Sequence, residues 1–168
     1  MELEEAEKCY QVRHNGQRYT ITRKRGARKE VGAWNDLAEL SSVQFQQWTF
    51  KVGESIRIRM QNNKDDAFAL IRQIKDLGDG RKVMFVLWYC SFDDIKDWGC
   101  INMEDWPEGR SLMLTTWMDV LMSSTANGKM GAKEQKEVVA EKVVDICRPN
   151  QARIYYKGDP FLEWMLQL

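Results

Sequence analysis

The sequence predicts a mainly β protein, organised as a small distorted β-barrel with long surface loops and short helical segments. Short segments rich in β-branched and aromatic residues recur along the chain, and turn residues separate them at intervals of about eight to twelve residues. No long segment follows a helical period, and no internal repeat is present. With 168 residues the chain is long enough to bury one sizeable core.

The first part of the chain gives the fewest regular patterns. Residues 1–9 are expected to be a frayed acidic start, and residues 19–23 alternate in a way that fits a short strand or an ordered arm. Residues 34–40 hold only enough apolar positions for one helical turn. We therefore expect residues 1–45 to be an N-terminal basic extension that packs on, or leads into, a domain at residues 46–168.

The central part carries the clearest strands. Residues 46–51 follow a two-residue period, and residues 55–60 alternate between apolar and basic side chains. Residues 67–77 also suit a helix, but the glycine-containing turn at residues 78–80 favours a strand. Residues 83–89 are apolar, rich in β-forming residues and bounded by turn residues, so they are predicted to form a strand.

The last part mixes β character with a polar segment. Residues 112–120 are expected to be a strand end and a loop, and residues 138–147 and 154–156 return to β character. Residues 122–137 are small, polar and without pattern, which predicts a flexible insertion. Residues 161–166 form a short terminal segment around a tryptophan.

The net charge of zero conceals two opposite regions. The chain has 25 Lys and Arg against 25 Asp and Glu, which argues against a protein that coats DNA through bulk positive charge. Residues 93–120 hold seven acidic and two basic side chains together with Trp98, Trp106 and Trp117. A basic run lies in residues 23–29, formed by Arg23, Lys24, Arg25, Arg28 and Lys29. We expect one positive strip and one negative surface rich in aromatic residues.

The residues offer little for catalysis or for a cofactor. His14 is the single histidine and lies in a polar run typical of a solvated loop, which excludes a multi-histidine metal centre. Gly78 and Gly80 belong to a hairpin turn rather than to a phosphate-binding loop. The cysteines lack the close spacing of zinc ligands and are typical of reduced intracellular thiols: Cys9, Cys90, Cys100 and Cys147. We expect no enzyme, no metal, no cofactor and no small-molecule substrate.

The chain also lacks the marks of a membrane or secreted protein. No apolar run approaches the roughly 20 residues that span a bilayer. The acidic start has no apolar segment of the kind found in secretory signals. We expect no contact with a membrane.

Seven tryptophans in a chain of this size suggest a binding role for some of them. A tryptophan face attracts ammonium groups, and a methylated lysine keeps its charge while losing much of its hydration. Carboxylates beside such rings would suit the basic tail that carries the modified lysine. Trp34, Trp48 and Trp164 have aliphatic neighbours and are expected in the core.

Four segments together resemble the bromo-adjacent homology (BAH) domain in their order and spacing. They are Val52-Gly-Glu-Ser-Ile-Arg-Ile, Ala67-Phe-Ala-Leu-Ile-Arg-Gln-Ile, Val83-Met-Phe-Val-Leu-Trp-Tyr and Leu112-Met-Leu-Thr-Thr-Trp-Met-Asp-Val. The resemblance covers about residues 50–150 and is similar to fungal members, in which the domain lies near the start of a larger chromatin protein. It implies a distorted β-barrel without catalytic activity, acting in the nucleus as a protein-interaction module in transcriptional repression and gene silencing.

Some members of this family read methylated histone tails through an aromatic cage. The resemblance aligns the central tryptophan of that cage with Trp88, and Trp117 and Asp119 with the "H-x-D" part of a later motif. Two further aromatic positions of the cage are occupied by Ala67 and Cys90, so the usual three-walled cage is incomplete. The histone-tail site is therefore expected among Trp88, Tyr89, Asp93, Trp98, Trp117 and Asp119. Trp88 as an ordinary core residue is the alternative.

Two functions of the binding class follow. In the first, the domain reads a methyl-lysine, most simply the repressive polycomb-type mark on histone H3. In the second, it docks on a nucleosome or a silencing partner without regard to methylation, and the residues of the basic run at 23–29 contact DNA phosphates or an acidic histone patch. A third reading, an enzyme or enzyme subunit, finds little support in the residues.

Overall fold

The protein is mainly β, as the sequence predicts. The computed structural model describes residues 7–14, 17–24, 37–60, 65–78, 80–146 and 152–156, and for the two ranges before residue 25 it describes the backbone alone. The strands are β1 (Glu7–His14), β2 (Gln17–Lys24), β3 (Ala38–Leu40), β4 (Ser42–Phe45), β5 (Trp48–Lys51), β6 (Ser55–Ile58), β7 (Ala67–Asp76), β8 (Lys82–Ser91), β9 (Leu112–Met122), β10 (Ala126–Lys129), β11 (Val138–Asp145) and β12 (Arg153–Tyr156). The helices are α2 (Phe92–Asp97), η1 (Met103–Asp105), η2 (Ser123–Thr125) and α3 (Ala132–Glu137).

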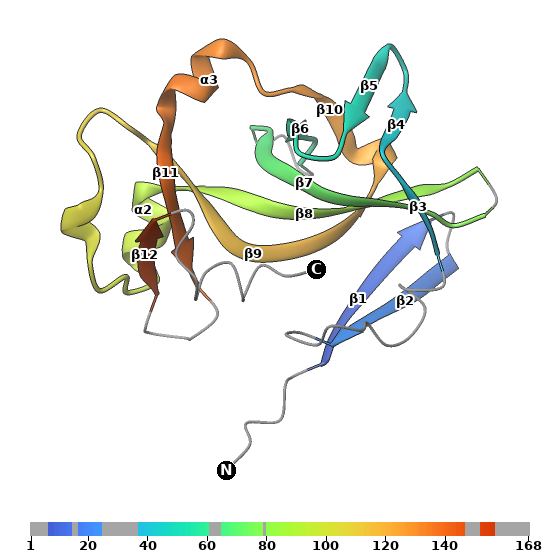
Figure 1. Ribbon diagram of the computed structural model, residues 1–168, viewed down its shortest axis with the longest axis horizontal. Helices are drawn as coiled ribbons and strands as arrows, with labels where there is room; N and C mark the ends of the chain where they lie inside the picture. The colour runs from blue at the N-terminus through green and yellow to red at the C-terminus, as the bar shows by residue number, and fades with distance from the viewer. Residues whose placement is uncertain are drawn as a thin grey trace.

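One curved sheet of eight strands forms the body of the molecule (Figure 1). Its order is β10-β6-β7-β8-β9-β11-β12. β6 pairs with the first residues of β7, and β3 pairs with its last three residues. The pairs are antiparallel except for β9 with β11, which run parallel. The outer strands β10 and β12 do not pair with each other, so the described strands form an open sheet and the expected barrel closure is not observed.

Two hairpins complete the β structure. β4 pairs with β5 above one end of the sheet, and β1 pairs with β2 below it, with β1 lying against β9 (Figure 1). β3 and β4, which the sequence predicted as part of an extension, therefore pair with strands of the predicted domain. Residues 7–9, expected to fray, begin β1.

Both faces of the central strand β8 are buried, which explains its continuous apolar run. Val83, Phe85 and Leu87 pack on one face with residues of β9 and β11. Met84 and Val86 pack on the other face with residues of β4 to β7. The predicted strands at 46–51, 55–60, 67–77 and 83–89 are thus confirmed, with ends that differ by a few residues.

Two predicted elements are wrong. The helical turn expected at residues 34–40 is instead the strand β3 over its last three residues, because these pair with Ile74 to Asp76 of β7. The loop expected within residues 112–120 belongs to β9, an 11-residue strand that lies between β8 and β11. Trp34 and Trp164 lie outside the described residues, as do Cys147 and residues 161–166.

Residues 122–137 also differ from the unpatterned insertion that composition predicted. They form η2, β10 and α3, and β10 pairs with β6. Gly128 lies in β10 with a φ of +119°, and a Cβ placed there would lie 3.4 Å from the Trp48 ring. The positive φ accounts for the glycine at this position, and the backbone of β10 packs against the Trp48 ring.

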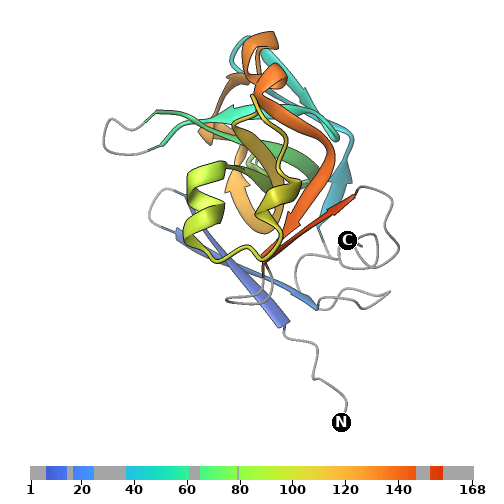
Figure 2. The ribbon, with the colours of Figure 1, turned by 90° about the vertical axis from the view of Figure 1, so that its left-hand side faces the viewer.

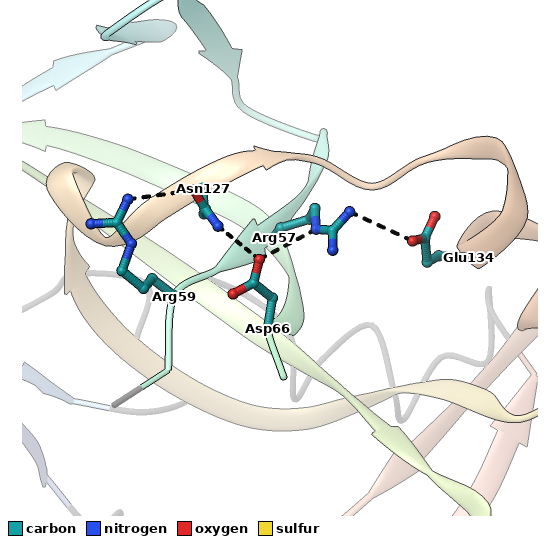
Figure 3. A network of polar contacts seen from close by, with 5 residues as sticks. All are labelled: Arg57, Arg59, Asp66, Asn127 and Glu134. Carbon is teal, nitrogen blue, oxygen red and sulfur yellow. Dashed lines mark hydrogen bonds and ion pairs between the residues drawn. The ribbon is translucent and has the colours of Figure 1, made fainter. Parts of the chain in front are cut away.

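A polar network links β10 and α3 to β6 and to Asp66, which precedes β7 (Figure 3). Arg57 lies between two carboxylates, with Nε 3.4 Å from Asp66 Oδ2 and Nη1 3.7 Å from Glu134 Oε1. Asn127 donates to Asp66 Oδ2 at 2.8 Å and accepts from Arg59 Nη2 at 3.4 Å. Exposed ion pairs contribute only about 0–1 kcal/mol each, so the network orders this edge more than it stabilises the fold.

Candidate functional site

Three tryptophans from separate elements meet on one side of β8 and β9. The ring centroids of Trp88 and Trp117 lie 6.3 Å apart with planes inclined by 53°. Those of Trp98 and Trp117 lie 5.7 Å apart and are nearly perpendicular, at 83°. Inclined rings form corners rather than a parallel stack, and a corner can offer two aromatic faces to one cation. We call these three rings, together with Asp119, the tryptophan cluster.

Trp88 is fixed by its place in β8. Side chains alternate along a strand, so Trp88 lies on the face of Met84 and Val86, where it packs between two parts of the core. Its cross-strand neighbour is Ala69, a small residue that leaves room for the indole. Trp88 is half-buried, so it is both a core contact and a wall of the cluster.

Trp117 owes its exposure to an irregularity in β9. Leu87 pairs with Met118 and Tyr89 with Leu114, so Trp88 opposes the three residues between them. Such bulges bend a strand and redirect a side chain. Trp117 is 47% exposed, although it lies in the middle of an 11-residue strand.

Buried hydroxyl groups hold this bulge in place. Thr115 Oγ1 donates to the Trp88 carbonyl at 2.9 Å and accepts from the Trp117 N–H at 3.1 Å. Thr116 Oγ1 donates to Asp145 Oδ1 at 3.0 Å and accepts from the Ile146 N–H at 3.1 Å. The bulge therefore has a defined shape, set by β8 on one side and β11 on the other.

Trp98 follows the short helix α2. Ser91 caps this helix by accepting from the Asp94 N–H at 3.1 Å, and the Trp98 N–H closes its last turn. The loop after Trp98 lies against β12 (Figure 2), where Asn102 accepts from the Ile154 N–H at 2.8 Å and donates to the Ile154 carbonyl at 3.1 Å. These bonds place Trp98 beside Trp117.

Asp119 supplies the charge of the cluster. It follows Trp117 by two residues in β9, so both lie on the same face, and its Oδ1 accepts from the Val120 N–H at 2.8 Å. Burial raises the pKa of Asp119, while the Val120 N–H and the Trp88 indole lower it. No cation among the described residues forms an ion pair with it.

The contact between Trp88 and Asp119 is incomplete. The indole N–H acts on the carboxyl group and lowers the pKa of Asp119, yet Nε1 makes no hydrogen bond of standard geometry to a described residue. A long or bent contact of this kind can still act electrostatically without being a hydrogen bond. Among the described residues, the buried Trp88 Nε1 therefore has no hydrogen-bond partner, and the Asp119 carboxylate has no cation.

Other predicted site residues lie apart from the cluster. Tyr89 points to the opposite face of β8 from Trp88 and hydrogen-bonds Ser55 Oγ through its hydroxyl at 2.7 Å. Burial raises the pKa of Tyr89. Asp93 is exposed in the first turn of α2, at the opposite end of that helix from Trp98.

Cys90 and Ala67, which the sequence resemblance aligned with two aromatic positions, have structural surroundings. Cys90 packs in the core with Trp106 and Met113, and burial, aided by Asp94, raises the pKa of its thiol to about 12. A thiol with that pKa stays protonated at neutral pH and acts as apolar packing. Ala67 begins β7, where it pairs with Ile58.

Most of the predicted basic run at residues 23–29 lies outside the described residues. Arg23 and Lys24 end β2, where the backbone alone is described, and Arg25, Arg28 and Lys29 lie outside the described residues.

Within the described ranges, no three His, Cys, Asp or Glu side chains are grouped to hold a metal ion. No helix in those ranges is long and apolar enough to cross a membrane.

The sequence missed the residues that shape the site. Thr115, Thr116 and Asp145 are buried and position Trp117, but nothing about them individually suggests a site. One signal was present: two threonines interrupt the apolar run of residues 112–120. Buried hydroxyl groups need hydrogen-bond partners, so such an interruption indicates polar contacts beneath the strand.

Replacing Tyr89 by phenylalanine is expected to lower the free energy of unfolding by about 1 kcal/mol, since it removes one partly buried hydrogen bond. Urea unfolding measures the change. The matched variant Ser55→Ala removes the same bond from the other side, so the double variant should cost little more than either single one. Fully additive costs would show that the Tyr89–Ser55 bond contributes nothing.

No protein-family model and no curated protein matches this chain.

Proposed function

We propose that this chain is a non-catalytic chromatin-binding module of the BAH type, which binds a methylated lysine of a histone tail at the tryptophan cluster. The proposal includes a nuclear location, a role in transcriptional repression or gene silencing, and the repressive polycomb-type mark on histone H3 as the ligand. It also includes the distorted barrel of that family, of which the open curved sheet would be the main part.

The observation that carries the proposal is Asp119. A half-buried carboxylate is costly without a partner, and this one interacts with the Trp88 indole but has no cation among the described residues. A methylated lysine supplies both missing contacts, because its positive charge faces the carboxylate and its methyl groups pack on the rings. A protonated amine without methyl groups would lose more hydration on entering the same place.

The surface around Trp98 supports a basic partner. Six carboxylates between residues 93 and 108 are exposed: Asp93, Asp94, Asp97, Glu104, Asp105 and Glu108. Two exposed basic residues, Lys96 and Arg110, lie in the same stretch. An excess of negative charge at this density favours the approach of a basic tail and makes its binding sensitive to salt.

Replacing Trp117 by alanine is expected to weaken binding of a methylated histone H3 peptide by about 3- to 30-fold, since one cation–π wall is removed. Calorimetric titration with methylated and unmodified peptides of one sequence measures the change. Trp117 is 47% exposed, so the fold should survive the substitution.

The matched control is Tyr156→Ala. Tyr156 is another exposed aromatic residue of the sheet, with its ring under Lys142 and no ring contact with the three tryptophans. Its removal should leave peptide binding unchanged. If the wild-type chain bound all peptides equally and weakly, the reader function would be excluded. Nucleosome binding that depends on salt and is lost on deletion of residues 23–29 would then favour docking that is independent of methylation.

A further inference from the structure

No described strand pairs with the outer edge of β12, and one asparagine side chain bonds that edge instead. Asn102 Oδ1 accepts from the Ile154 N–H at 2.8 Å, and Asn102 Nδ2 donates to the Ile154 carbonyl at 3.1 Å. Beside it, the Ile101 N–H donates to the Ala152 carbonyl at 2.9 Å. A carboxamide carries the same donor and acceptor as a peptide group, so Asn102 satisfies both backbone groups of Ile154 as a neighbouring strand would.

The Asn102 side chain bonds this edge and not the helix that follows it. Asn102 directly precedes η1, at the position where asparagine ordinarily accepts from a helix N–H, but its side chain makes no such bond. Its Nδ2 donates to Asp105 Oδ2 at 3.0 Å as well as to the Ile154 carbonyl. Both amide hydrogens are therefore used, and the side chain has no donor left for a ligand.

Apolar contacts also hold this loop against the core, but they do not set its position along β12. Trp98, Cys100 and Met103 are partly buried and pack on the core cluster that includes Ile154. The burial of apolar surface has no direction, so these contacts alone would tolerate a shift of the loop along the strand. The two bonds between Asn102 and Ile154 are directional, so they fix the loop at one residue of β12.

The position of Trp98 depends on this fixed point. The helix α2 holds the chain before Trp98, and Asn102 holds it afterwards. The Trp98 and Trp117 rings meet nearly at right angles, with centroids 5.7 Å apart. A shift of one residue along a strand, about 3.3 Å, is more than half of that separation and would change the corner between the two rings.

We infer that Asn102 is a positioning residue for the tryptophan cluster: by bonding the open edge of β12 it holds Trp98 against Trp117. The inference rests on the proposed function for its ligand, and it adds a residue on which affinity depends without contact with that ligand. Because Asn102 acts through Trp98, its removal can weaken binding no more than the removal of Trp98 itself.

The positioning of Trp98 is tested first without a ligand. Each indole N–H gives one signal in a heteronuclear NMR spectrum, and single Trp→Phe variants identify the signals of Trp98 and Trp117. Asn102→Ala is expected to shift both of them. The signal of Trp48, which stacks on Phe50 instead, should stay in place.

The matched control is Asn127→Ala. Asn127 is another asparagine whose amide donates to a carboxylate, that of Asp66, at 2.8 Å. It lies in β10, at the other end of the strand order from β12. Its removal should leave the Trp98 and Trp117 signals and peptide binding unchanged.

The second measurement is calorimetric titration with methylated and unmodified histone H3 peptides of one sequence. Asn102→Ala is expected to weaken binding of the methylated peptide by about 2- to 10-fold, since one cation–π wall is displaced. In a Trp98→Ala background the same substitution should cost no further affinity, because the ring that it positions is gone. Should Trp98→Ala not fold, Trp98→Leu replaces it, since leucine keeps apolar contact with the core.

Three results separate this inference from the proposed function. If the wild type prefers the methylated peptide, but Asn102→Ala changes neither the indole signals nor the affinity, the inference is wrong and the reader function stands. If its cost in affinity adds fully to that of Trp98→Ala, Asn102 does not act through Trp98, and the inference is equally wrong. If no methylated peptide binds more tightly than the unmodified one, the reader function fails, whereas shifted indole signals would still support the positioning of Trp98 by Asn102.

Discussion

Replacing Trp106 by alanine is expected to lower the free energy of unfolding by about 3–5 kcal/mol, the usual range for a large aromatic residue in a core. Trp106 is 9% exposed and packs with Ile95 and Met113. Its Nε1 donates to the Arg110 carbonyl at 2.9 Å, and its ring lies edge-on to Phe92 with centroids 5.2 Å apart. The substitution removes all these contacts and leaves a cavity.

Urea unfolding measures this loss, and two variants calibrate it. Trp106→Phe keeps most of the apolar contact but not the hydrogen bond, so it should cost clearly less than Trp106→Ala. Phe92→Ala removes the edge-on partner at a position that is 36% exposed, and its cost should also be smaller. A loss below about 1 kcal/mol for Trp106→Ala would show that this ring is not part of the core.

Trp106 and Trp117, both in the acidic stretch, are thus expected to contribute to different properties, one to stability and the other to peptide affinity. Trp106→Ala should lower stability, whereas Trp117→Ala should lower peptide affinity and leave stability nearly unchanged. Composition could not separate them, because both lie among carboxylates in one segment of residues 93–120. Their difference arises from where the chain places them: one under α2, the other on a bulge of β9.

The strands could be predicted where the pattern is local. Residues 83–89 are apolar because both faces of β8 are buried, and that run predicts a strand in any fold. The same run does not reveal which face a given residue occupies until one register is known. Tyr89 was predicted in the site beside Trp88, but adjacent residues of a strand point to opposite faces, and the Tyr89 hydroxyl bonds Ser55 instead.

The remaining features depend on contacts between distant segments. β9 is a full strand because β8 and β11 lie on either side of it, and β11 follows it after about 15 residues that include β10 and α3. The segment at residues 122–137 consists mostly of small and polar residues, as disordered segments do. In the structure, however, its strand β10 pairs with β6, and Gly128 lies beside the Trp48 ring. The composition of a segment does not reveal a pairing partner that lies about 70 residues away in the sequence, as β6 does from β10.

The hydrogen bonds that hold the bulge in β9 are expected to contribute strongly to stability. Replacing Thr116 by valine is expected to lower the free energy of unfolding by about 2–4 kcal/mol, although valine has nearly the same shape. The Thr116 hydroxyl donates to Asp145 and accepts from the Ile146 N–H, and Thr116 and Asp145 are 0% and 5% exposed. Without the hydroxyl, two polar groups lose a hydrogen bond, and each such loss costs about 1–3 kcal/mol when water cannot replace it.

The conservative variant Thr116→Ser separates the hydroxyl from the methyl group. It keeps both hydrogen bonds, so it should cost much less than Thr116→Val in urea unfolding. Equal costs for the two variants would assign the effect to packing and remove the hydroxyl from the account.

Peptide binding should follow the same order, because the bulge that Thr116 anchors also carries Trp117. Thr116→Val is expected to bind the methylated peptide more weakly than Thr116→Ser when both are measured well below their unfolding temperatures. A polar pair buried beneath β9 would then determine the position of an exposed ring on its surface. If Thr116→Val retained full affinity despite its lower stability, Trp117 would hold its position through Trp88, Trp98 and the Thr115 bonds alone.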